Sequence, residues 1–104
     1  MIFNIDQGIH RFYRSISNKE HLSVIENLLR KMTDVDLNSF HWNGQPLVHL
    51  CCLYNRLDVL ELLVDTGRCD ATTFNQDGWL PIHIAVYLGH MDIVQYLVRT
   101  HSSI

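Results

Sequence analysis

The chain has 104 residues, of which 47% are hydrophobic and 18% are charged, and its formal net charge is −3. A chain of this length has room for one compact domain. Its eight Lys and Arg residues are scattered along the sequence, which argues against nucleic acid as a partner. The longest nearly apolar stretch, Pro46 to Tyr54, is far shorter than the roughly 20 residues of a membrane-spanning helix, so no membrane insertion is expected.

The N-terminal residues and the cysteines bear on where the protein resides. Residues 1–6 lack the basic start and the long apolar run of a secretory signal, so we expect a reducing location in the cytoplasm, the nucleus or both. The cysteines are odd in number, and Cys51 and Cys52 are adjacent, which disfavours a disulfide framework. These two residues and Cys69 are therefore expected to be free thiols.

Two units of the same design follow one another from residue 36 onward. In the first, residues 36–44 occupy the place of a loop or hairpin, and two short helices follow. In the second, residues 70–78 are rich in turn formers and predict an extended loop or hairpin. A short helix should then run from Pro81 to about Leu88, and Gly89 should end it ahead of a second helix over residues 92–98.

The second unit repeats the first at a distance of 34 residues. Helices this short are marginal alone in water, where about 12–15 residues are needed, so they must be stabilised by packing against the next unit. A fixed period between 20 and 50 residues predicts an all-α repeat protein, or solenoid. The identical pairs are Gly44 and Gly78, His49 and His83, Asp58 and Asp92, Leu63 and Leu97, Val64 and Val98, and Thr66 and Thr100.

These motifs resemble those of the ankyrin-repeat family, whose unit joins a hairpin loop to two antiparallel helices and carries a Gly-x-Thr-Pro-Leu-His turn. The segment Gly78 to His83 differs from that turn at Leu80, which replaces the threonine, and the segment Gly44 to His49 has Pro46 one place early. The threonine normally caps the first helix. Its absence should therefore reduce the stability of each unit by about 1 kcal/mol.

The resemblance extends to a divergent first unit. Residues 21–29 match the second helix of the family, and the first helix would begin near His10. His10 to His21 is a longer interval than His49 to Arg56, so we expect four additional residues in the turn between the helices, within residues 15–19. The whole chain, 1–104, would then form one ankyrin-repeat domain with units at roughly 5–37, 38–71 and 72–104.

A metal or thiol site around His49, Cys51 and Cys52 is the main chemical alternative. Imidazole and thiolate bind zinc, but residues two and three apart on a helix point in divergent directions, and no second pair of ligands follows. A nucleophilic cysteine also needs an orienting group and a concave site. We therefore expect no metal, no cofactor and no enzyme activity. The resemblance implies that His49 and His83 make structural hydrogen bonds.

The resemblance implies that a protein or peptide binds the concave side of the stack, through the hairpin tips and the exposed face of the first helices. Six of the twelve positions are aromatic, and they should present roughly 300–500 Å² of apolar surface. Alternatively, the two phenylalanines form a structural ladder and Trp79 covers a helix end. The twelve positions are Phe40, Trp42, Asn43, Gln45, Leu53, Tyr54, Phe74, Gln76, Asp77, Trp79, Tyr87 and Leu88.

The sequence thus predicts a non-catalytic interaction module that acts as a scaffold, an adaptor or an inhibitor. The main alternative is a fragment of a larger ankyrin-repeat protein, for example a ubiquitin-ligase adaptor or the cytoplasmic region of a channel. Residues 102–104 do not resemble the polar cap that terminates a stack. Tyr96 and Val98 are expected to face outward there, so the last helix could support self-association.

Overall fold

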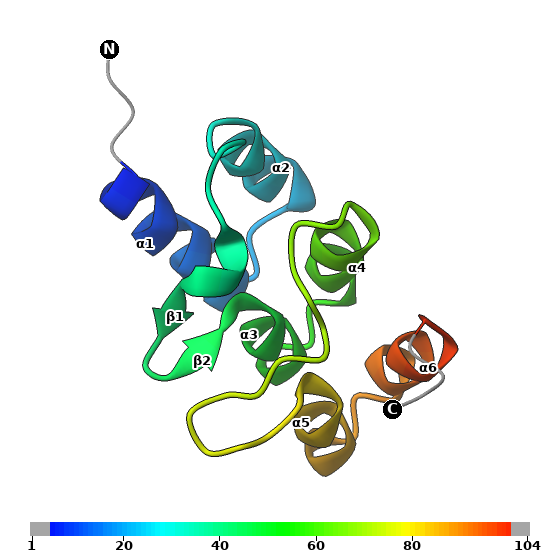
Figure 1. Cartoon of the computed structure of the whole chain (residues 1–104). Helices are drawn as coiled ribbons and strands as arrows, with labels where there is room; N and C mark the ends of the chain where they lie inside the picture. Colours follow the sequence, from blue (N-terminus) through cyan, green and yellow to red (C-terminus); the bar gives the residue numbers. More distant parts are fainter. Residues whose placement is uncertain (1–4, 101–104) are drawn as a thin grey trace.

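Three pairs of antiparallel helices follow one another along the chain (Figure 1). The structure is a computed structural model that describes residues 5–100, with side chains described from Gln7 onward. The first helices of the pairs form one row and the second helices form another, which confirms the predicted all-α stack. The helices are α1 (Ile5–Ser17), α2 (Leu22–Arg30), α3 (Leu47–Leu53), α4 (Leu57–Asp65), α5 (Pro81–Leu88) and α6 (Met91–Thr100).

The turn between the two helices has the same backbone conformation in every pair. Lys19, Asn55 and Gly89 each adopt a left-handed conformation, with φ of +56°, +56° and +76°. Glycine is the usual residue here because it lacks a Cβ, and asparagine also tolerates the conformation. The next residue donates its N–H to a carbonyl five residues earlier in all three turns, and this satisfies one of the last carbonyls of each first helix.

This shared turn corrects the register predicted for the first unit. The N–H of Glu20 bonds to the carbonyl of Ser15, as the N–H of Arg56 bonds to that of Cys51. By this register Tyr13, and not His10, is the counterpart of His49. The prediction of four additional residues in the turn is therefore wrong. One additional residue lies in the turn, and the remaining length belongs to α1, which has 13 residues where α3 has seven.

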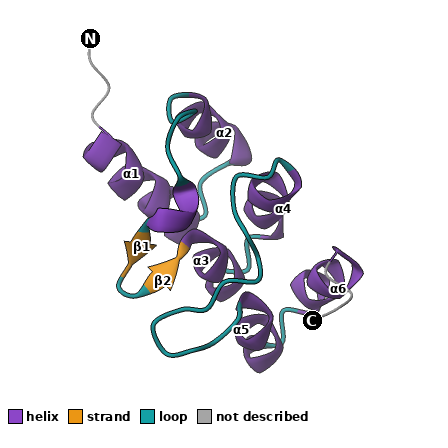
Figure 2. Ribbon diagram, viewed as in Figure 1, coloured by secondary structure: helices purple, strands orange, loops and turns teal. Residues whose placement is uncertain are grey.

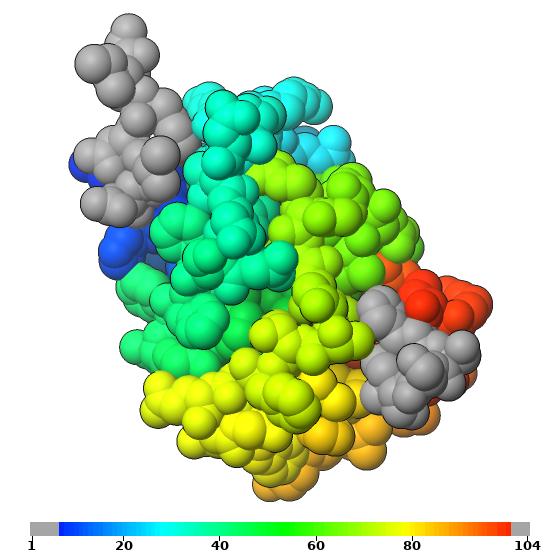
Figure 3. Space-filling view, in the orientation of Figure 1, coloured from blue at the N-terminus to red at the C-terminus, as the bar shows by residue number. Residues whose placement is uncertain are grey.

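The loops ahead of α3 and α5 lie side by side on one side of the stack. The first contains a short 3-10 helix (Leu37–Ser39) and a hairpin of β1 (His41–Trp42) and β2 (Gln45–Pro46), drawn in orange in Figure 2. The second forms no strand over residues 70–78, so the predicted loop or hairpin is a hairpin in the first of these units and a loop in the second. The yellow second loop abuts the green hairpin in Figure 3, and the Gln76 N–H donates to the Gly44 carbonyl at 3.1 Å.

Two features favour glycine at position 44, at the tip of this hairpin. Its φ is +79°, and Asn43 before it has φ of +52°, the pair of positive values that a tight two-residue hairpin turn needs. A Cβ on Gly44 would lie 2.3 Å from Oε1 of Gln76. Any other residue at this position would therefore have to displace the exposed Gln76 side chain and adopt an unfavourable backbone conformation.

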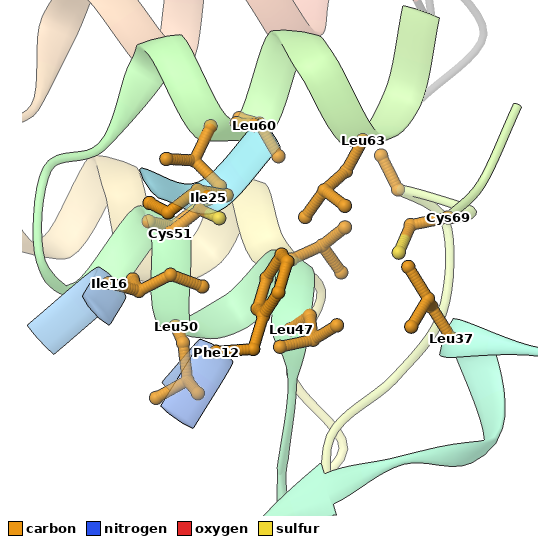
Figure 4. Packing of buried hydrophobic residues seen from close by; sticks show 14 of the residues in the cluster. Phe12, Ile16, Ile25, Leu37, Leu47, Leu50, Cys51, Leu60, Leu63 and Cys69 are labelled. Atoms are coloured by element: carbon orange, nitrogen blue, oxygen red, sulfur yellow. The ribbon is translucent and has the colours of Figure 1, made fainter. Parts of the chain in front are cut away.

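The core runs through the stack between the two rows of helices. Figure 4 shows Phe12 of α1 beside Leu47 of α3, and Cys69 beside Leu63. Phe12, Leu47, Leu63 and Cys51 are at most 1% exposed. Phe12 thus contributes a large buried side chain from the first unit to the core that the middle unit shares.

Side chains ahead of the second helices tie each unit to the one before it. Arg56 donates from Nη1 to the Ser15 carbonyl at 3.3 Å, and its Nε and Nη2 each donate to the Asp58 carboxylate at 3.1 Å. The hydrogen bonds from the guanidinium lower the pKa of Asp58. His90 bonds through Nδ1 to the Cys52 carbonyl at 2.8 Å. Asp58 therefore holds the guanidinium of Arg56 in place, and His90 has a structural role.

Tyr96 was expected to face outward, and that prediction is wrong. It is 3% exposed, and its hydroxyl donates to Oδ1 of Asp65 on α4 at 2.6 Å. Val98 does face outward, with 52% of its surface exposed. Residues 102–104, on which the missing polar cap was argued, lie outside the described residues. Within 5–100 the chain has no helix long and apolar enough to cross a membrane.

Candidate protein-binding surface

The twelve candidate residues lie along one side of the stack, on the hairpin, on the second loop and toward the ends of α3 and α5 (Figure 1). We call this side, defined by those twelve residues, the hairpin face. Six large apolar side chains on it are each 37–78% exposed. They are Trp42, Leu53, Phe74, Trp79, Tyr87 and Leu88.

Trp42 forms an aromatic cluster with α1. Its ring centroid lies 4.7 Å from that of His10, edge to face, and 5.3 Å from that of Tyr13. Both distances are typical of favourable aromatic pairs. Trp42 also lines a small groove of about 50 Å³ together with Arg14 and Tyr54. The hairpin of the second unit therefore holds its tryptophan against the first unit, with 37% of that side chain still exposed.

Trp79 forms a second cluster with α5. Its ring lies 6.2 Å from Tyr87 and 6.1 Å from His83, both edge to face. One side of Trp79 lines a groove of about 230 Å³ that also includes Leu53 and Leu88. Its other side lines an open hollow of about 510 Å³ with His83 and Val86. Trp79 thus packs along α5 and is still 42% exposed.

The two phenylalanines do not share one environment. Phe40 is half-buried and packs against the core, whereas Phe74 is 59% exposed. Tyr54, at the end of α3, is also half-buried against the core. Phe40 and Tyr54 therefore have mainly structural contacts, and Phe74 presents most of its ring to solvent.

The four polar candidates also divide into residues with structural contacts and residues that are exposed to solvent. Gln45 is half-buried, and its Oε1 accepts a hydrogen bond from Nδ2 of Asn75 at 3.0 Å, which links the two loops. Asn43 shapes the hairpin tip through its positive φ. Gln76 and Asp77 are exposed on the second loop. Asp77 lines both hollows beside Trp79.

Sequence reasoning missed the contribution of the first unit to this surface. His10, Tyr13, Arg14 and Ser17 of α1 approach Trp42 or line its groove. The incorrect register of the first unit hid them, because Tyr13 stands where the other units have histidine. The turn between the helices was the only signal for the correct register. Its left-handed residue is Lys19 in the first unit and Asn55 in the second, so the sequence did not show that the two turns are equivalent.

His49 and His83 make the structural hydrogen bonds that the resemblance implied. Nε2 of His49 bonds to the Trp79 carbonyl at 2.7 Å, which joins the second unit to the third. Nδ1 of His83 accepts the N–H of Leu80 at 2.9 Å. The equivalent position in the second unit is Pro46, which has no N–H. The buried Nδ1 of His49 accordingly has no hydrogen-bond partner among the described residues.

The thiols lack the features of a nucleophilic site. Cys51, Cys52 and Cys69 are free and buried. Burial raises the pKa of Cys52 and of Cys69 to about 12, and it raises the pKa of Cys51 well above the usual value. A nucleophilic cysteine requires a lowered pKa. Across residues 5–100, no group of three or more His, Cys, Asp or Glu side chains is arranged to hold a metal ion.

Paired helices, a shared left-handed turn and histidine bonds between units define a helix-turn-helix repeat protein. Residues 12–104 match the family model described as ankyrin repeats, with three copies. The match covers most of the chain, and the chain belongs to the ankyrin-repeat family. Ankyrin repeats are protein–protein interaction modules.

Three proteins illustrate the sequence similarity of this chain to known proteins. The Notch-regulated ankyrin repeat-containing protein of Xenopus tropicalis is 37% identical over 90 residues, which cover 85% of this chain and 78% of that protein. The protein of the same description from Homo sapiens is 36% identical with the same coverage. Tyrosine-protein kinase HTK16 of Hydra vulgaris is 28% identical over 97 residues, which cover 92% of this chain and 12% of the kinase.

Proposed function

We propose that the chain is a non-catalytic adaptor or inhibitor that binds a protein or peptide on its hairpin face. The observation that carries this proposal is the exposure of Trp42 and Trp79 in two clusters on the same side of the stack. Tryptophan is among the residues most enriched at binding hot spots. We also propose a reducing, intracellular location and a Notch-regulated setting. The free thiols support the location, and the description of the relatives supports the setting.

The double substitution Trp42→Ala and Trp79→Ala tests the surface. Partners would be captured from cells with activated Notch signalling, and the dissociation constant of each would be measured with the original chain and the variant. We expect at least a tenfold loss of affinity, because truncation of a hot-spot residue costs about 2 kcal/mol or more. A partner whose affinity is unchanged would contradict the proposal.

Met91→Ala with Val98→Ala is the matched control. Both residues lie on α6, away from the hairpin face, and they are 56% and 52% exposed. The control removes exposed apolar surface from another side of the molecule, so it should leave partner affinity within about twofold, the range expected outside hot spots. Circular dichroism would establish that both variants keep the helical stack.

A second candidate function is assembly through the outer side of α5 and α6. Cys52 of the second unit is fully buried, whereas Val86, its counterpart 34 residues later, is 59% exposed. Likewise, His49 is buried, whereas its counterpart His83 is exposed. The third unit therefore covers this surface of the second unit. The equivalent surface of the third unit is exposed.

Light scattering of the chain distinguishes this candidate from the first. Self-association through the outer side predicts a molecular mass that rises with concentration and returns to that of a monomer in the Met91→Ala, Val98→Ala variant. A monomer at all concentrations, or an oligomer that the Trp42→Ala, Trp79→Ala variant disrupts instead, would contradict association through α5 and α6.

A further inference from the structure

The hairpin face carries two grooves at equivalent positions in successive units. The upstream groove, of about 50 Å³, lies between α1 and α3, and the downstream groove, of about 230 Å³, lies between α3 and α5. Leu50 and Tyr54 line the upstream groove. Their counterparts one period later, Ile84 and Leu88, line the downstream groove. The helix residues of the two grooves therefore occupy equivalent positions one unit apart, whereas the two tryptophans, Trp42 and Trp79, come from different positions of the repeat.

Each groove combines an aromatic wall with one charged residue. Trp42 and Arg14 line the upstream groove, and Trp79 and Asp77 line the downstream groove. Both charged side chains are exposed. Because no other charged residue among those described lines either groove, the pair of sites is positive at one end and negative at the other. A ligand that spans both grooves would match this surface with an acidic and a basic group at opposite ends.

The spacing of the grooves distinguishes between two extended backbones, the polyproline II helix and the β-strand. Packed helices lie about 8–10 Å apart, so the grooves should repeat at about that distance. In a polyproline II helix, residues i and i+3 project to the same side, about 9 Å apart. In a β-strand the same two residues project to opposite faces.

We propose that the hairpin face binds a polyproline II segment of a partner protein. Apolar side chains at i and i+3 enter the two grooves. In the ligand, an acidic residue follows or precedes the apolar residue that enters the groove beside Arg14. A basic residue has the same place next to the apolar residue that enters the groove beside Asp77. Aromatic surfaces suit such segments, because the polyproline II helix is preformed and loses little entropy on binding. This inference rests on the proposed function of the hairpin face.

Two synthetic peptides test the proposal, and together they cover both chain directions. One is Glu-Leu-Pro-Pro-Leu-Lys, and the other is Lys-Leu-Pro-Pro-Leu-Glu. A control peptide has its two leucines only two residues apart. Binding to the full chain would be followed by NMR titration. We expect one of the two peptides to bind about three- to tenfold more tightly than the other at low salt, since two surface ion pairs favour it, and more tightly than the control.

Charge reversal in the protein supplies the decisive comparison. The variant Arg14→Glu with Asp77→Lys should invert the preference between the two peptides, whereas Arg11→Glu, an exposed residue of the same helix, should preserve it. An unchanged preference in the reversed variant, no advantage over the control peptide, or no binding of either peptide at about 1 mM would overturn the proposal. The proposed function would survive those results if a natural partner still required Trp42 and Trp79.

Discussion

Replacing Phe12 by alanine should destabilise the domain by about 3–5 kcal/mol, the usual effect of removing a buried phenylalanine. A domain of this length is stable by only about 5–15 kcal/mol, so the variant should be partly unfolded or close to it. The physical reason is that Phe12 is fully buried and reaches from α1 to Leu47 in the core (Figure 4). Urea unfolding followed by circular dichroism measures the change.

Phe74→Ala is the matched control, because it makes the same chemical change at a side chain that is 59% exposed. It should alter stability by no more than about 0.5 kcal/mol. If both variants unfolded at the same urea concentration as the original chain, α1 would not be an integral part of the stack. The first unit would then be a loosely attached cap, as its divergent sequence alone would allow.

Replacing His49 by alanine should destabilise the domain by about 2–4 kcal/mol, because it removes a fully buried side chain and leaves the Trp79 carbonyl without its donor. Thermal and urea unfolding would measure the loss. His83→Ala is the control. His83 is exposed, and its loss removes the bond from the Leu80 N–H and an edge-to-face contact with Trp79, so we expect about 0.5–1.5 kcal/mol. Equal effects of the two substitutions would contradict this bridging role.

The same histidine should make stability depend on pH. Burial lowers the pKa of His49 below the usual 6.5, the nearby His41 and His83 lower it further, and the bond to the Trp79 carbonyl opposes both effects. Because the unfolded chain binds this proton more readily, the stability contributed by neutral His49 is complete above pH 6.5 and is lost as the pH falls below it. The pKa of Asp58 lies below 3.8, so that group titrates at lower pH.

The variant His49→Ala should therefore lose less stability between pH 7 and pH 5 than the original chain, as measured by urea unfolding at both values. Pro46→Thr should act in the opposite direction. It supplies an N–H to Nδ1 of His49, which should add about 1 kcal/mol at neutral pH, and protonation of Nδ1 would break this bond. Identical pH profiles for all three chains would show that His49 is not the group responsible.

The candidate surface was only partly predictable from the sequence. The period placed Trp79, Tyr87 and Phe74 in the loop or on the first helix of the third unit, where the structure leaves all three exposed. It could not show that Phe40 and Tyr54 pack mainly against the core. Nor could it show that His10 and Arg14 join the surface, because the first unit lacks the motif that would have fixed its register.

The sequence by itself determined the family, the helix pairs and the left-handed turn at Gly89, since each depends on residues close together in the chain or on the period that relates them. Only the tertiary structure decided the contacts between units. Arg56 reaches Ser15, Tyr96 reaches Asp65, and α1 takes up the additional residues of the first unit. The physical reason is that these contacts depend on how neighbouring helices pack, and one extra residue in a turn changes which side chains meet.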